Sequence, residues 1–193
     1  MWNLKQFMNK ILLSTLLLLA IGFTGISQTQ TGEKYGTTLN LGVGIGYYRY
    51  IGNSTPVFHA NLELDVARNF TLAPFITYFS YQKYRYWGNN QNDYRNYYYR
   101  QTTIPIGLKG TYYFDSFLHA TSKWDFYLAA SLGFAYRTTR WEQGYNGDFK
   151  VENGTSGLYW DGHIGVEYHI NQRVGLLLDL SSGISTFCLA LHI

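Results

Sequence analysis

The side chains best suited to chemistry lie close together near the end of the sequence. Ser181, His163 and Asp179 supply the hydroxyl, the base and the carboxylate that a nucleophilic hydrolase needs within reach of one another. His163 and His169 with Glu167 supply donors for a metal ion, but a zinc site needs a fourth ligand and an open geometry. Whether either group assembles depends on the secondary structure that carries these residues.

After residue 27 the chain is dominated by an alternation of apolar with small or polar residues, which is typical of β-strands. From Leu39 to Tyr47, for example, every second residue is apolar, and Asn40 and three glycines lie between them. The pattern predicts no helix in this region and eight strands: residues 37–48, 57–66, 70–82, 99–114, 124–137, 157–169, 173–182 and 185–193. More than half of this region would be strand, against a usual 20–25%, which requires a special architecture.

The first residues have the form of an export signal. A short region with Lys5 and Lys10 precedes an apolar stretch, and small residues follow up to Ser27, so residues 1–27 are predicted to be a cleaved signal peptide. Residues 28–36 would be a short periplasmic lead-in to a domain of residues 37–193. Loss of the two lysines lowers the formal net charge from +3 to +1. The remaining chain therefore lacks the clustered positive charge that a nucleic-acid-binding surface needs. Cys188 is the single cysteine, which excludes an intramolecular disulfide.

Every second connection between the predicted strands is short or compact, and two of the other four, residues 83–98 and 138–156, are long, as in an up-and-down barrel with turns at one rim and larger loops at the other. Charged residues make up 14% of the chain and aromatic residues 19%, and the less apolar strand face is rich in Gly, Ala, Ser and Thr. Such a face is a poor soluble surface but suits a narrow lumen. We therefore predict an all-β fold, an eight-stranded antiparallel up-and-down transmembrane β-barrel, in preference to a soluble barrel around an apolar ligand. Pro74 and Pro105 fall within strands, where a bulge or strand end would accommodate them.

Two stretches carry a resemblance to a known family. TTIPIGLKGTYYF at residues 102–114 and SKWDFYLAASLGFAY at residues 122–136, followed by a last strand, resemble the small porin-like outer-membrane β-barrel domain family of Gram-negative bacteria. The resemblance spans nearly all of residues 34–193 and implies an eight-stranded barrel in the bacterial outer membrane. The chain departs from the family at its last residue, Ile193, where such chains commonly end in an aromatic residue.

Strand alternation places a set of charged residues on the lumen face. Because unpaired charges are costly in a narrow interior, we expect these residues to pair. The structural interpretation is that these residues form ion pairs that fill the lumen. The functional alternative is that they line a gate or a narrow cation-preferring pore. The predicted lumen network is Glu63, Asp65, Lys109, Arg137, Asp161, His163, Glu167 and Asp179.

The most distinctive local composition is the basic, tyrosine-rich stretch of residues 83–100. Basic side chains at an outer rim would face lipopolysaccharide phosphates, and the tyrosines suit the headgroup region or a partner surface. The alternative is that the flanking strands simply extend beyond the bilayer. The predicted binding residues are Lys83, Arg85, Tyr86, Trp87, Arg95 and Arg100. Residues 138–156 form the second predicted large loop and show only turn chemistry at their Asn-Gly pairs.

The expected function is therefore a structural or interaction role in the outer membrane. Loops 83–98 and 138–156 would engage lipopolysaccharide, an external ligand or other outer-membrane proteins in a complex. A narrow pore and a lipid-modifying enzyme are the alternatives. Pairing His169 with Arg173 across the last but one hairpin would bring His163 opposite Asp179, but the His-x-Ser arrangement of lipid A deacylases is absent, since residue 165 is Gly. We expect no catalysis, no cofactor and no metal site.

Overall fold

The computed structural model describes residues 36–46, 53–54, 56–67, 69–89, 92–114, 123–148 and 157–193. The predicted signal peptide and residues 28–35 of the predicted lead-in lie outside the described residues. Among the described residues, no helix is long and apolar enough to cross a membrane. The strands are β1 (Thr37–Gly46), β2 (Asn53–Ser54), β3 (Val57–Ala67), β4 (Phe70–Asn89), β5 (Asn92–Tyr113), β6 (Trp124–Trp141), β7 (Gly157–Asn171), β8 (Val174–Ser181) and β9 (Ile184–His192).

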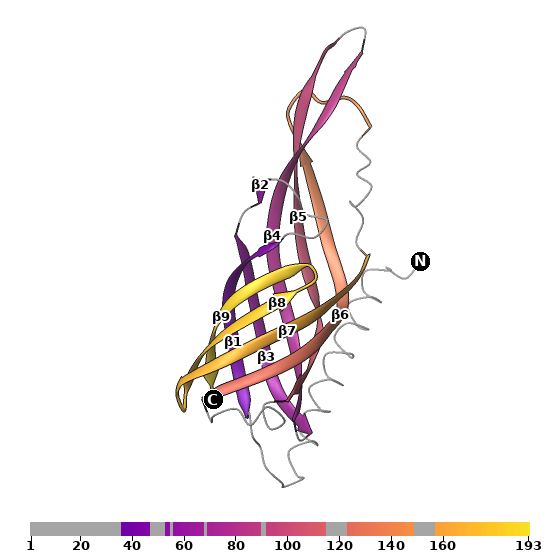
Figure 1. Ribbon diagram of the computed structural model, residues 1–193. Helices are drawn as coiled ribbons and strands as arrows, with labels where there is room; N and C mark the ends of the chain where they lie inside the picture. Colours follow the sequence, from indigo (N-terminus) through magenta and orange to yellow (C-terminus); the bar gives the residue numbers. More distant parts are fainter. Residues whose placement is uncertain are drawn as a thin grey trace, which may run out of the picture. The chain divides into compact units, whose positions relative to one another are not determined.

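Eight of these strands form one closed antiparallel sheet, as predicted (Figure 1). Each strand pairs with its neighbours in the chain, and β1 pairs with β9 to complete the ring, with Leu41 opposite Leu189. The two-residue β2 adds to the side of β4 at Tyr81 and Gln82. We call the end with the β3–β4 and β7–β8 turns the terminal rim, because β1 begins and β9 ends there. The opposite end is the loop rim.

The hairpin formed by β4 and β5 extends far beyond the other strands at the loop rim (Figure 1). Its ladder continues through Tyr84 opposite Tyr98 and Trp87 opposite Arg95. The prediction that residues 83–98 form a loop is therefore wrong, and the alternative, that the flanking strands extend, is correct. The reason is that tyrosine and tryptophan favour strands and pair well across them, even where both faces are partly polar and the alternation fades. The second expected loop, 138–156, begins with four residues that belong to β6.

Pro74 and Pro105 lie within strands, without the expected bulge or strand end. The β3–β4 ladder has no pairs between Asn61–Phe75 and Leu64–Leu72, and the same register resumes beyond the gap around Pro74. The β4–β5 ladder shows a similar gap around Pro105, while the β5–β6 ladder runs through Pro105 unbroken. Each proline lacks an N–H group and therefore interrupts one ladder locally.

Candidate functional site

The centre of the barrel interior holds a charged and hydrogen-bonded group that we call the central network. Lys109 of β5 forms an ion pair with Asp179 of β8, and both side chains are only 5% exposed. Asp179 also accepts a hydrogen bond from the Tyr127 hydroxyl at 2.8 Å and contacts His163 Nδ1 at 2.7 Å. The Lys109 ammonium lies 4.8 Å from the centre of the Tyr127 ring. Asp179 is thus held from β5, β6 and β7 at once, so the network ties strands across the lumen.

Glu63 of β3 is the second buried carboxylate of the central network. It accepts a hydrogen bond from the Tyr113 hydroxyl at 2.6 Å and one from Asn40 at 3.2 Å, and the Thr71 hydroxyl also donates to it. The rings of Tyr113 and Tyr127 are tilted against each other at 5.7 Å between centroids. The two carboxylates are therefore joined through a pair of buried phenols.

The other predicted lumen charges lie nearer the rims. Toward the loop rim, Asp161 accepts hydrogen bonds from Ser181 at 2.7 Å and Tyr159 at 3.1 Å, and Ser182 also donates to it. Arg137 is half-buried on the inward face of β6, opposite Thr103 of β5. The predicted network is accordingly divided along the barrel axis.

At the terminal rim, Glu167 contacts His192 Nε2 at 2.9 Å. Asp65 accepts the backbone N–H of Gly36 at 2.8 Å. Both carboxylates belong to the predicted lumen set, and they lie apart from Asp161 and Arg137, which are nearer the loop rim.

The register of the β7–β8 hairpin differs from the prediction by two residues. His163 lies opposite Ser181, and His169 lies opposite Gly175, because an irregularity between His169 and Asn171 shifts the register beside the turn. Ser181 is engaged at the β8–β9 turn, where its Oγ accepts the backbone N–H of Ile184 at 2.7 Å. The hydroxyl beside His163 Nε2 is instead that of Ser131, at 2.8 Å.

Ser131, His163 and Asp179 reproduce the order of contacts of a hydrolytic triad. Acyl transfer also needs donors that stabilise an oxyanion, usually free backbone N–H groups. Ser131 lies in the middle of β6, paired with Lys109 on one side and Asp161 on the other, so the surrounding backbone is committed to the sheet. With Ser131 itself buried, we interpret these contacts as part of the central network.

Adjacent tyrosines on opposite faces of β5 give a matched test of the central network. Tyr113→Phe removes the hydrogen bond to buried Glu63 and should lower the free energy of unfolding by about 1–3 kcal/mol. Tyr112→Phe removes the same atom from the exposed outer face and should have little effect. Urea titrations of the refolded proteins would compare them. Equal stabilities for the two variants would contradict a stabilising role for the Glu63 contact.

An aromatic cluster at the loop rim joins the β4–β5 hairpin to the segment after β6. Tyr145 is buried at its centre, stacked on Trp141 at 4.1 Å and edge-on to Trp87 and Tyr97, each at 5.3 Å between centroids. Tyr99 packs on Trp141 at 4.7 Å. Burial raises the pKa of the Tyr99 phenol above its usual value, so this phenol stays neutral well above physiological pH. The cluster fixes the hairpin against residues 142–148.

Two predicted binding arginines take part in the same junction. Arg95 lies 3.3 Å from Glu142, whose other oxygen accepts the backbone N–H of Tyr98 at 3.0 Å. Arg85 donates to the backbone carbonyl of Asp148 at 3.2 Å. Arg85, Trp87 and Arg95 therefore contact the protein itself, in positions that the sequence alone assigned to a ligand.

Of the other predicted binding residues, Arg100 and Tyr86 lie on the outward face, whereas Lys83 is half-buried on the side of β4 that carries buried Tyr81; the outward face also bears one arginine that the sequence analysis missed. Arg100 is exposed, and its direct neighbour on β6 is the exposed Arg140. Tyr86 is also exposed and packs on Tyr94, and the Lys83 ammonium lies 5.5 Å from the centre of the Tyr81 ring. The outward position of Arg140 could have been predicted, because it lies four residues after Tyr136 and alternate residues of a strand share a face.

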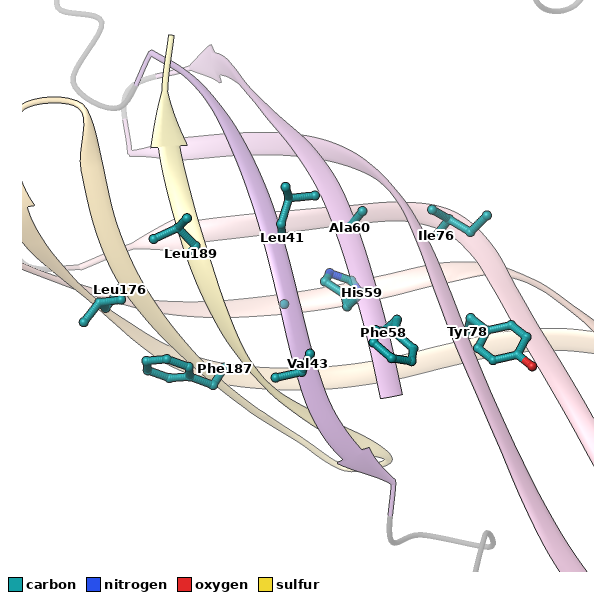
Figure 2. A pocket seen from close by; sticks show the side chains of 11 residues that line it. Leu41, Val43, Phe58, His59, Ala60, Ile76, Tyr78, Leu176, Phe187 and Leu189 are labelled. Carbon is teal, nitrogen blue, oxygen red and sulfur yellow. The ribbon is translucent and has the colours of Figure 1, made fainter. Parts of the chain in front are cut away.

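The outer face of the barrel between the rims is apolar. Leu132 and Phe134 of β6 are 59% and 71% exposed, and Trp160 of β7 is 73% exposed. The same face of β1, β3, β4, β8 and β9 bears an open apolar hollow of about 670 Å³ (Figure 2), whose lining includes Leu41, Val43, Phe58, Phe187 and Leu189. A sheet with charges buried inside and leucine, phenylalanine and tryptophan exposed outside is inverted relative to a soluble protein, and this inversion suits lipid.

The protein is a transmembrane β-barrel. The aromatic residues expected at the membrane interface are present near strand ends, with Trp124 and Tyr168 in contact at 4.7 Å near the terminal rim and Tyr136 exposed on the way to the loop rim. The hollow in Figure 2 opens on the apolar side of the barrel, where it would be filled by acyl chains.

Comparisons with known proteins find structural likenesses at low sequence identity. No protein-family model matches the chain, and no curated protein is significantly similar to it in sequence. Among solved structures, the barrel is similar to a de novo designed transmembrane β-barrel, with 11% identity, a TM-score of 0.49 and coverage of 85% of this chain and 100% of that one. It is similar to the outer membrane protein W of E. coli, with 12% identity, a TM-score of 0.47 and coverage of 84% and 100%.

The N-terminal β-barrel domain of Pseudomonas aeruginosa OprF is also similar, with 12% identity, a TM-score of 0.44 and coverage of 81% of this chain and 94% of that one. The fold rests on the strand pairing and on the exposed apolar face.

Proposed function

We propose that this barrel resides in a bacterial outer membrane and has a non-catalytic interaction role, binding lipopolysaccharide phosphates at its loop rim. The observation that carries the proposal is the exposed pair of Arg100 and Arg140, which lie directly opposite each other on β5 and β6. Like charges that face each other across strands destabilise a sheet. Among the described residues, neither guanidinium has an acidic ion-pair partner, and an anion between them would offset the repulsion.

The position of the arginine pair supports phosphate as that anion. Arg140 follows the exposed Tyr136 by four residues on the same face of β6, about 13 Å along the strand. We infer that headgroups replace acyl chains at this level, next to the apolar belt. Arginine is well suited to phosphate because its planar guanidinium donates two parallel hydrogen bonds.

The exposed Tyr84 and Tyr98 supply aromatic surface beyond the arginine pair. They form a cross-strand pair on the extended hairpin, next to Gln82 and Arg100 in the ladder. Aromatic side chains with a polar tip favour a membrane interface or a partner surface. A partner protein in a membrane complex would therefore meet this part of the hairpin.

The arginine pair can be tested by lipid A binding to the refolded barrel in detergent. Replacing both residues, in Arg100→Gln with Arg140→Gln, should weaken binding of lipid A about tenfold or more, because each charge-assisted hydrogen bond contributes about 1.5–3 kcal/mol. The matched control is Arg173→Gln, an exposed arginine in the turn at the opposite rim, which should bind as the wild type does. Dephosphorylated lipid A should bind all three proteins equally weakly.

Equal affinity of wild type and double variant for intact lipid A would refute the phosphate role of the pair. A decrease that is just as large for dephosphorylated lipid A would show that the arginines act through something other than phosphate.

The pore alternative finds little support in the interior. Lys109, Asp179, Tyr113, Tyr127 and Glu63 contact one another in a chain that reaches from β3 to β8 across the lumen. An eight-stranded barrel has room for little more than its own side chains. We therefore expect planar bilayers containing the barrel to show no discrete conductance steps.

A further inference from the structure

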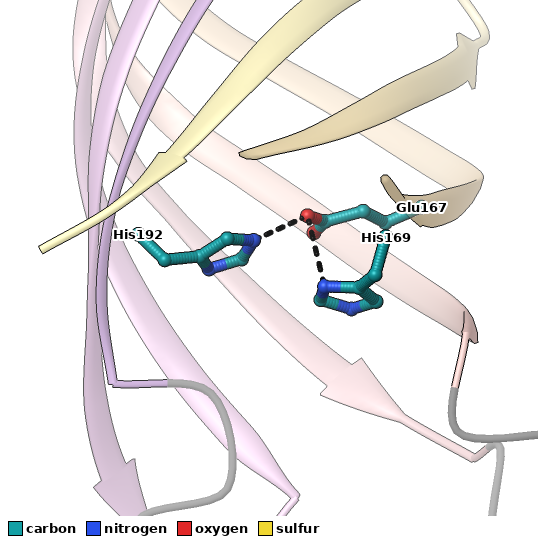
Figure 3. A group of neighbouring side chains, drawn as sticks. All are labelled: Glu167, His169 and His192. Carbon is teal, nitrogen blue, oxygen red and sulfur yellow. Dashed lines mark hydrogen bonds and ion pairs between the residues drawn. The ribbon is translucent and has the colours of Figure 1, made fainter. Parts of the chain in front are cut away.

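Three potential metal ligands converge inside the barrel at the terminal rim (Figure 3). Glu167 and His169 are two residues apart on β7, so they share its inward face, and His192 reaches them from β9. One carboxylate oxygen of Glu167 lies 2.9 Å from His192 Nε2 and 3.9 Å from His169 Nδ1. One ligand atom from each residue falls within 4.8 Å of the others.

We propose that Glu167, His169 and His192 bind a divalent transition metal ion of the zinc class. Two imidazole nitrogens and one carboxylate oxygen are the donor set of open zinc sites, in which water or a further ligand takes the fourth position. Ligand atoms at the usual bond lengths around a tetrahedral zinc are about 3.4 Å apart. The two separations from Glu167, 2.9 and 3.9 Å, bracket this value, and all three ligand atoms lie within 4.8 Å of one another, so small side-chain shifts would bring them to a metal ion.

The second nitrogen of each histidine is already held by the protein. His169 Nε2 is 2.7 Å from Asp125 Oδ2, and His192 Nδ1 is 2.9 Å from the Thr38 hydroxyl. These contacts orient His169 Nδ1 and His192 Nε2 toward Glu167, as the outer partners of metal-binding histidines do. The second carboxylate, Asp125, also adds negative charge that would balance a dication.

The strand between β7 and β9 leaves space for the ligands. Gly175 of β8 lies between these strands in the sheet, opposite His169 on one side and Ala190 on the other. A Cβ atom at Gly175 would collide with the Glu167 carboxylate, so glycine is what allows the carboxylate to lie over β8 toward His192. The two imidazoles stack at 5.0 Å between centroids.

The site is open to ions from the water at the rim. The side chains of His169 and His192 are 23% and 16% exposed, whereas Glu167 is 4% exposed. A metal ion would therefore be bound at the mouth of the lumen, apart from the central network. The proposal is independent of lipopolysaccharide binding, which concerns the opposite rim.

The test uses the untagged barrel, refolded in detergent and treated with a chelator. Titration with Zn²⁺ by calorimetry should give one ion per chain, and Co²⁺ should give the intense visible absorption of a tetrahedral site. His169→Gln and His192→Gln should each abolish both signals. His59→Gln is the control, because His59 lies elsewhere in the interior with its nitrogens bonded to Thr77 and Asn61, and this variant should bind as the wild type does.

Thr38→Val tests the outer contacts, since it leaves all three ligands in place and should weaken Zn²⁺ binding about 10- to 100-fold. Heat-modifiable gel migration would establish that each variant is folded. A folded wild type that binds no Zn²⁺ and gives no Co²⁺ spectrum would overturn the proposal, whatever the variants do. Unchanged Zn²⁺ affinity in the two histidine variants would also overturn it.

Discussion

Replacing Lys109 with methionine should lower the free energy of unfolding of the barrel by about 3–5 kcal/mol. The substitution keeps much of the aliphatic volume of the side chain but leaves Asp179 as a buried carboxylate without its cation. Tyr127 and His163 would remain as hydrogen-bond partners of Asp179. Neither supplies the fixed positive charge that the ammonium group contributes, so the uncompensated charge dominates the loss.

Two further variants separate the charge effect from the loss of a lysine as such. Adding Asp179→Leu to Lys109→Met removes both charges and should recover part of the lost stability, because an apolar pair costs less than one unpaired charge. Lys83→Met removes a lysine from the hairpin outside the central network and should change stability by less than about 0.5 kcal/mol. Urea titrations of the refolded proteins measure all three. A Lys109→Met barrel as stable as wild type would mean that the pair does not hold the interior together.

The second large effect is expected from a charge on the outer face. Leu132→Arg places a guanidinium near the middle of the apolar belt and should cost about 2–4 kcal/mol for the barrel folded in lipid vesicles. The penalty arises because the charge must leave water for the hydrocarbon layer or distort that layer. The loss of stability in Leu132→Arg should be compared with that in Leu132→Ala, which shortens the side chain at the same place without adding a charge.

Depth along the barrel supplies the matched control. Tyr84→Arg introduces the same side chain at an exposed position of the extended hairpin, beyond the arginine pair, and should be nearly neutral. If the outer face met water along its whole length, both arginine variants would be tolerated equally. That result would contradict a membrane-spanning belt between the rims.

Most of the fold follows from strand alternation in the sequence. All eight predicted strands are present, and five of them end within two residues of the predicted bounds at every described end. The exceptions are the ends of β4, β5 and β6 toward the loop rim, where the alternation that marks a lipid-facing strand no longer applies. Beyond Tyr81 the inward face of the hairpin carries Lys83 and Arg85 and packs through Trp87 and Tyr97 on Tyr145, so the apolar alternation of the earlier part of the strand no longer marks it.

The interior contacts could be predicted only in part. The alternation of residues along the strands predicts that Lys109, Asp179 and Glu63 lie on the inward face, and all three are buried there. The alternation does not show which of these side chains contact one another. Contacts across a lumen depend on the stagger of strands that are far apart in the sequence. The pairing of His163 with Ser131 in place of Ser181 shows how a shift of two residues beside one turn changes the chemistry of a site.

The cluster at the terminal rim illustrates the same limit. His169 and Glu167 were recognised as potential ligands, but His192 belongs to a different strand and joins them only because β8 carries Gly175 between them. A sequence pattern records neither the closure of the sheet nor the space that one glycine opens.

The seam between β1 and β9 has a consequence for how the chain folds. Thr38 and His192 are separated by 154 positions in the chain, yet they are hydrogen-bonded across this seam. Closing so long a segment carries an entropy cost before any contact compensates it, so we expect folding to be slow and the seam to form late. Until then β1 and β9 are open edges that pair readily with other chains. A molecule that lacked β9 would keep most of its hairpins but would present an unpaired edge at each end of its sheet.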